Sequence, residues 1–124
     1  MDTSVVLIAA CEPKQLTGAV RRALDHGPAH LSVVAYWEVM VKSMKGTLEV
    51  GDPRDWWKET LRDLDLMPLV WHPEHVTALY DLPAIHQDPF DRAMIAQAIA
   101  EDLALLTTDR EIPKYGSSRF QAIT

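Results

Sequence analysis

The sequence predicts an α/β fold in which a central parallel sheet is flanked by helices. Short apolar stretches of strand length alternate with longer segments that carry helix-start and helix-stop residues. With 124 residues, of which 48% are hydrophobic, the chain is large enough to bury one core. It contains no repeat, low-complexity tract or linker, so we expect residues 1–124 to form a single domain.

Capping residues mark the expected helices. Pro13 is expected to begin a helix that runs to about His26 and stops at Gly27. A second helix is expected from Ser32 to Gly46, with a serine as its N-cap and a glycine at its end. Three more are expected to begin at Asp-Pro or His-Pro pairs, and a last short one is expected at Asp109. The pairs are Asp52-Pro53, His72-Pro73 and Asp88-Pro89.

Brief apolar stretches between these helices are the expected strands. They are Ala29–Leu31, Met67–Val70, Ala104–Thr107 and Phe120–Ile123. The start of the chain departs from the alternation, because Thr3 to Ala10 is compatible with a helix or with a buried strand and its pattern does not decide between them.

Composition excludes several classes of protein. Twelve basic and 18 acidic residues give a formal charge of −6, so binding to nucleic acid by bulk attraction is excluded and would need a local basic patch or bound cations. The single cysteine, Cys11, excludes an internal disulfide and a thiolate zinc site, which suits a cytoplasmic protein. The longest apolar run, Val5 to Cys11, is too short to span a bilayer, so we expect no membrane association.

Four acidic residues stand where the sheet would converge on a ligand, beyond the carboxyl ends of its strands. Asp109 follows a strand, Glu38 lies in the second turn of a helix, Asp91 lies in the first turn of another, and Asp2 precedes the first apolar segment. Two carboxylates ~4 Å apart repel by roughly 4 kcal/mol at an effective dielectric constant of about 20. A bound cation relieves such repulsion, and oxygen ligands select Mg²⁺ or Mn²⁺.

Each of these acids also has a purely structural explanation. Asp2 is near the terminus and could be frayed and solvated, while Glu38 precedes Lys42 by four residues, the spacing of a helix-surface ion pair. Asp91 could complement a helix dipole, and Asp109 could be an N-cap. Only their joint placement at one edge of the sheet indicates a site.

Basic residues near these acids, and two histidines elsewhere, also have two explanations. Lys42, Arg92 and Arg110 could bind phosphates of a ligand or could simply pair with neighbouring acids. His72 and His75 lack a third ligand nearby in the sequence, so we expect surface or capping residues and not a zinc site.

Three segments, in order, resemble the PIN-domain ribonucleases, and most closely the VapC group of toxin–antitoxin systems. They are Ser32-Val-Val-Ala-Tyr-Trp-Glu-Val-Met-Val-Lys42 with Gly46, His86-Gln-Asp-Pro-Phe-Asp-Arg-Ala-Met-Ile-Ala-Gln-Ala98, and Leu106-Thr-Thr-Asp109. The opening Asp2-Thr-Ser-Val-Val also fits that group, so the resemblance covers nearly the whole chain.

The resemblance implies a three-layer PIN fold and a Mg²⁺- or Mn²⁺-dependent endoribonuclease, the toxin of a VapBC-type pair. It also suggests a homodimer and an antitoxin that blocks the site. By position, the catalytic and metal-binding acids would be Asp2, Glu38, Asp91 and Asp109, with Ser32 and Thr107 as nearby hydroxyls.

One departure from the family concerns the start of the domain. Family members have several apolar residues, forming the first strand, before the first Asp, whereas only Met1 precedes Asp2 here. We therefore expect a first strand that is missing or very short, and an Asp2 that is loosely held. The alternative function is a catalytically silent PIN-like interaction module. A phosphatase or phosphotransfer domain is a third, but no phosphate-cradling glycine loop is evident among five glycines.

Overall fold

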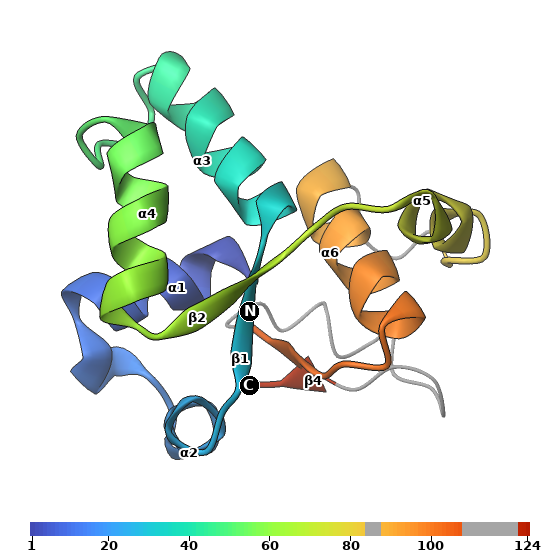
Figure 1. Cartoon of the computed structure of the whole chain (residues 1–124), viewed down its shortest axis with the longest axis horizontal. Helices are drawn as coiled ribbons and strands as arrows, with labels where there is room; N and C mark the ends of the chain where they lie inside the picture. Colours follow the sequence, from blue (N-terminus) through green and yellow to red (C-terminus); the bar gives the residue numbers. More distant parts are fainter. Residues whose placement is uncertain (84–87, 108–121) are drawn as a thin grey trace.

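The computed structural model describes residues 1–83, 88–107 and 122–124. Figure 1 shows helices packed around short parallel strands, which confirms the predicted α/β class. The elements are α1 (Thr3–Cys11), the 3-10 helix η1 (Pro13–Gln15), α2 (Gly18–Asp25), β1 (Ala29–Ser32), α3 (Val33–Met44), α4 (Pro53–Asp63), β2 (Leu66–Leu69), α5 (Pro73–Leu79), α6 (Pro89–Ala100), β3 (Leu105–Leu106) and β4 (Ala122–Ile123).

The described strands form two parallel pairs and not one continuous sheet. In the first pair β1 aligns Ala29 with Leu66 of β2, and in the second β3 pairs with β4. The first two residues of the chain link the pairs. The Met1 amine donates to the His30 carbonyl of β1 (3.1 Å), and the Asp2 N–H donates to the Leu106 carbonyl of β3 (2.8 Å). A cavity of about 200 Å³ lies beside this link, lined by residues of β1 and β3.

Helix starts follow the capping chemistry predicted from the sequence. The side chains of Ser32, Asp52 and Asp88 accept hydrogen bonds from the backbone N–H groups at the first turns of α3, α4 and α6, at 2.8–3.2 Å. Gly46 follows the end of α3 with φ of +74°, a conformation that only glycine adopts without strain. The predicted starts of α3, α4 and α6, and the predicted end of α3 at Gly46, are therefore confirmed to within two residues.

The secondary structure of two segments near the start of the chain was not predicted correctly or fully from the sequence. Thr3 to Ala10, which the pattern left undecided, is helical, because Asp2 caps α1 by accepting from the Val5 N–H at 2.9 Å. The single helix predicted from Pro13 to His26 is wrong. Its first turn is the isolated η1, and Thr17 caps a separate α2 through the Val20 N–H.

The core is built largely on α6, whose central residues are buried on every side, as its apolar sequence predicted. Helix α6 packs against α3 on one side and α5 on the other, and α4 covers α3 and β2. His75 of α5 is fully buried and not a surface residue: its Nδ1 accepts from the His72 N–H, and its Nε2 lies 2.7 Å from Glu101 Oε1. No helix among the described residues is both long and apolar enough to cross a membrane.

Candidate functional site

Asp2 is held in a buried position between the start of α1 and β3. The residue is only 3% exposed, and besides capping α1 its carboxylate accepts a hydrogen bond from the Thr107 hydroxyl just after β3. The expectation that Asp2 is frayed or loosely held is therefore wrong. Helix capping and the backbone link to Leu106 fix it, although only one residue precedes it.

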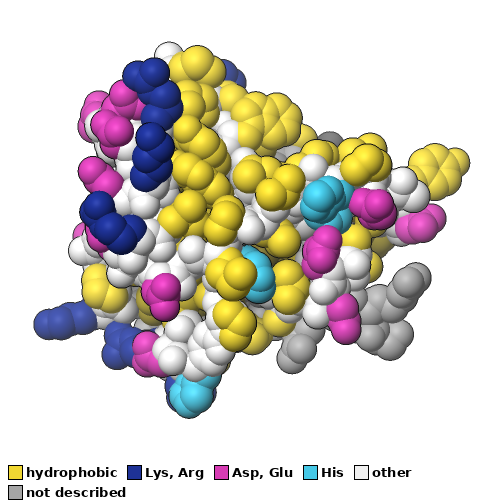
Figure 2. Space-filling view, in the orientation of Figure 1, with side chains coloured by type: hydrophobic (Ala, Val, Ile, Leu, Met, Phe, Trp, Pro, Cys, Tyr) yellow, Lys and Arg dark blue, Asp and Glu magenta, His cyan; other side chains and the backbone are white. Residues whose placement is uncertain are grey.

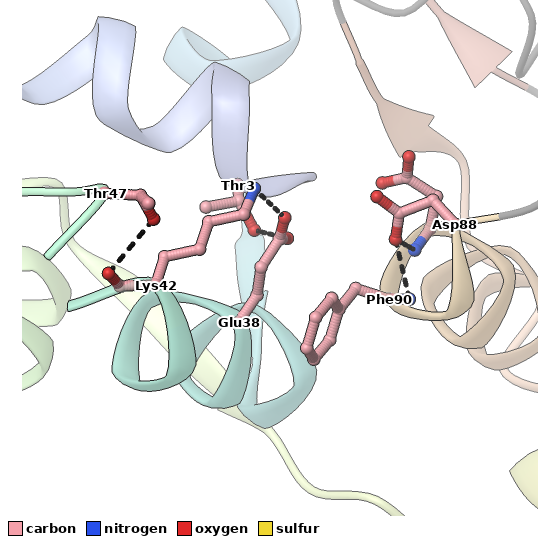
Figure 3. Close-up of polar contacts among 7 residues, drawn as sticks. Thr3, Glu38, Lys42, Thr47, Asp88 and Phe90 are labelled. Carbon is pink, nitrogen blue, oxygen red and sulfur yellow. Dashed lines mark hydrogen bonds and ion pairs between the residues drawn. The ribbon is translucent and has the colours of Figure 1, made fainter. Parts of the chain in front are cut away.

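Glu38 is the second buried carboxylate, on α3. It is 4% exposed, and each of its oxygens has a partner. Thr3, at the N-terminus of α1, donates from Oγ1 to Oε1 over a distance of 2.5 Å. Lys42, one turn further along α3, donates from Nζ to Oε2 over a distance of 2.7 Å (Figure 3). The i,i+4 pair with Lys42 that the spacing predicted is present, but its acidic member lies in the interior because α1 packs against α3.

Asp88 and Asp91 supply two further carboxylates at the start of α6. Asp88 accepts from the N–H groups of Phe90 (2.8 Å) and Asp91 (3.2 Å), and both acids are partly buried. Figure 3 shows Asp88 and Phe90 at the start of α6, across from the Glu38–Thr3 pair. Helices α1, α3 and α6 thus bring acids from three parts of the sequence into one region.

Electrostatic interactions connect these groups. Burial raises the pKa of the Asp2 carboxyl, the hydrogen bonds from Thr107 and Val5 oppose that rise, and the nearby charge of Glu38 adds to it. The hydrogen bond to Glu38 raises the pKa of Lys42, and the negative charges of Asp88 and Asp91 contribute to the same rise. Lys42 therefore lies in the field of three carboxylates from α3 and α6.

The remaining predicted site residues are placed as follows. Ser32 is buried as the cap of α3, and Thr107 is buried against Asp2. The Arg92 guanidinium donates to the Pro83 carbonyl at 2.8 Å. Asp109 and Arg110 lie outside the described residues.

The donor atoms of this region are of the kind that a hard divalent ion binds. Its described side chains offer carboxylate and hydroxyl oxygens, the ligands that Mg²⁺ and Mn²⁺ prefer, and two of the carboxylates are buried and repel each other. Within the described residues, no three His, Cys, Asp or Glu side chains are arranged to hold a metal ion. The donors therefore fit a hard divalent ion in kind, while a complete ligand set is not formed by the described residues alone.

Sequence reasoning missed two members of this region. Thr3 stands at the first position of α1 and fixes Glu38, and the Asp-Thr pair that opens the chain was its only signal. Asp88 was interpreted only as a helix cap, yet its charge also acts on Lys42. Its position three residues before Asp91, on the same helical turn, could have indicated this.

Comparisons with known proteins agree with this architecture. The family model of the PIN domain matches residues 1–117. A chain in the crystal structure of VapBC2 from Rickettsia felis, bound to a DNA fragment from its promoter, has a similar fold with a TM-score of 0.69. It is 12% identical in sequence, and the match covers 98% of this chain and 96% of that chain. No curated protein matches the sequence significantly.

Proposed function

The chain belongs to the PIN-domain family, and we propose that it is a divalent-metal-dependent endoribonuclease, the toxin of a VapBC-type toxin–antitoxin pair. The observation that carries the proposal is the pair of buried, mutually repelling carboxylates, Asp2 and Glu38, with the acids of α6 nearby. Buried negative charges that act on one another are unfavourable unless cations compensate them, and among the described residues Lys42 pairs with Glu38 alone, so we take the arrangement as support for binding of a divalent ion.

Asp2, Glu38, Asp91 and Asp109 are the residues that would hold Mg²⁺ or Mn²⁺. Such an ion, when bound, supplies activation of a water nucleophile and neutralisation of charge on the phosphate. The described side chains prepare its binding by fixing the oxygens. Thr107 orients the carboxylate of Asp2, and Thr3 orients that of Glu38, so neither ligand has to be ordered when an ion arrives.

Substrate binding is assigned to residues around these acids. Lys42, Arg92 and Arg110 would attract RNA phosphates, which a chain with a net charge of −6 needs if it binds RNA at all. Ser32 and Thr107 are assigned as hydroxyls near the site. Thr107 is hydrogen-bonded to Asp2, so its contribution to substrate binding would be indirect, through the position of that carboxylate.

The similar fold found in a VapBC2 complex supports an antitoxin partner for this chain, and its exposed apolar surface is compatible with an antitoxin or with a homodimer. Figure 2 shows hydrophobic side chains gathered over one face of the molecule, across α3, β2 and α5. Large apolar residues that are more than half exposed lie in these elements or directly after them: Trp37, Met44, Met67, Val70, Val76 and Tyr80. We assign this apolar band to contacts with an antitoxin or a second copy.

A cleavage assay tests the enzymatic part of the proposal. The protein is incubated with single-stranded RNA and Mn²⁺, alongside Asp91→Asn, Asp63→Asn and a sample with chelator. Asp63 is an exposed acid at the end of α4 that is not among the predicted site residues, so its variant controls for the loss of one surface carboxylate. We expect cleavage only by the wild type and Asp63→Asn with Mn²⁺, and a loss of at least about a hundredfold for Asp91→Asn.

Two outcomes would contradict the proposal in different ways. Equal cleavage in all four samples would identify a contaminating nuclease. No cleavage in any sample would favour the alternative function, a catalytically silent interaction module. In that case, binding through the apolar band would remain to be tested, with the oligomeric state measured by light scattering.

A further inference from the structure

Lys42 differs from an ordinary surface partner in an i,i+4 pair. Its ammonium lies 2.7 Å from Glu38 Oε2, yet the Lys42 side chain is 46% exposed while that of Glu38 is only 6% exposed. One end of the pair is therefore fixed in the interior, and the other reaches it from the solvent along the surface of α3 (Figure 3). Exposed pairs of this spacing contribute little to stability, whereas a buried carboxylate left without its cation is strongly destabilising.

The Lys42 ammonium and a metal ion would compete for the same oxygen of Glu38, Oε2. The other oxygen of Glu38 is engaged by the buried Thr3 hydroxyl at 2.5 Å, which leaves Oε2 as the oxygen that faces a mobile cation. The charges of Asp88 and Asp91 act on the same ammonium, so the field that holds Lys42 is the one that would attract a divalent ion. Two cations at one carboxylate repel strongly.

We propose that Lys42 is a resident counter-cation, which neutralises Glu38 in the metal-free protein and competes with the divalent ion for that carboxylate. This inference rests on the proposed metal-dependent function. Glu38 cannot move away, because it is buried and held by Thr3, whereas the half-exposed lysine can rotate its ammonium into solvent. Binding of the ion is therefore accompanied by release of Lys42 from Glu38.

Binding of Mn²⁺ itself provides the test. Isothermal titration calorimetry gives its dissociation constant for the wild type, Lys42→Met, Lys42→Arg and Lys45→Met. Methionine keeps most of the length of the lysine stem and removes the charge. Lys45 is an exposed lysine at the C-cap of the same helix, so its variant controls for a general change of charge.

We expect Lys42→Met to bind Mn²⁺ about threefold to tenfold more tightly than the wild type, because the repulsion from a displaced but nearby ammonium is removed. Lys42→Arg and Lys45→Met should stay within about twofold of the wild type. Thermal unfolding in chelator provides a second readout. Lys42→Met should melt at a lower temperature than the wild type without Mn²⁺ and gain more than the wild type on its addition.

The outcomes separate this inference from the function on which it rests. If the wild type binds Mn²⁺ and Lys42→Met binds it equally or more weakly, the inference is overturned and the proposed function stands. If Lys42→Met binds Mn²⁺ and the wild type does not, the inference is supported in its strongest form. If neither protein binds Mn²⁺, the metal-dependent function fails and the inference fails with it.

Discussion

Removing the hydroxyl of Thr3 tests whether α1 holds the central carboxylate of the site. Thr3 is 5% exposed and Glu38 is 4% exposed, and the 2.5 Å hydrogen bond between them joins α1 to α3. Thr3→Val keeps the shape of the side chain and leaves one oxygen of a buried carboxylate without its donor. Hydrogen bonds to charged groups contribute about 1.5–3 kcal/mol, so we expect the free energy of unfolding to fall by about 2 kcal/mol.

Urea unfolding followed by circular dichroism, in buffer with chelator, measures this loss. For a chain of this length it corresponds to a melting temperature lower by about 6–10 °C. Thr3→Ser is the matched control, because it keeps the hydroxyl and loses only a methyl group, which is worth about 0.8 kcal/mol. A double-mutant cycle with Glu38→Gln should give a coupling energy of about 1 kcal/mol or more. If Thr3→Val proves as stable as Thr3→Ser, Thr3 does not hold Glu38 and the reasoning is refuted.

Three other changes test the site and the core. Burial raises the pKa of Asp2 above its ordinary value of 3.8, so the folded state keeps the proton to higher pH than the unfolded chain and stability falls as the pH rises through that window. Asp2→Asn, which can still cap α1, should therefore be stabilised relative to the wild type more at pH 7 than at pH 4. If urea unfolding shows the same difference in free energy of unfolding between the two proteins at both pH values, this prediction is contradicted. His75→Ala should lower the free energy of unfolding by about 2–4 kcal/mol, because it opens a cavity and removes the hydrogen-bond partner of the His72 N–H and of Glu101. A loss below about 1 kcal/mol in urea unfolding would argue against a buried, hydrogen-bonded His75. Ile95→Ala, at a fully buried position of α6, should lower the free energy of unfolding in urea by about 2–5 kcal/mol. Val76→Ala, at a position 52% exposed, should change it by less than about 0.5 kcal/mol. Equal effects of the two substitutions would place Ile95 outside the core.

Helix starts were the part of the fold that could be predicted best, for a local reason. Ser32, Asp52 and Asp88 each satisfy backbone N–H groups two or three residues ahead of them, so the information lies within one turn of chain. Local chemistry was less decisive between Pro13 and His26. There the sequence has a proline that can start a helix and a threonine that can start another, and the structure uses both.

By itself, the sequence determined the α/β class, the starts of α3, α4, α5 and α6, the buried character of α6, and the membership in one family through motifs that occur in order. Tertiary structure alone decided the environment of the acids. Asp2 is fixed by Thr107, which is 105 residues away in the chain, and Glu38 by Thr3, which is 35 residues away. The i,i+4 spacing of Glu38 and Lys42 would be the same whether Glu38 lay on the surface or in the interior, so the spacing does not predict its burial. The difference arises because α1 packs over α3, and the free energy of that contact depends on residues that no local window contains.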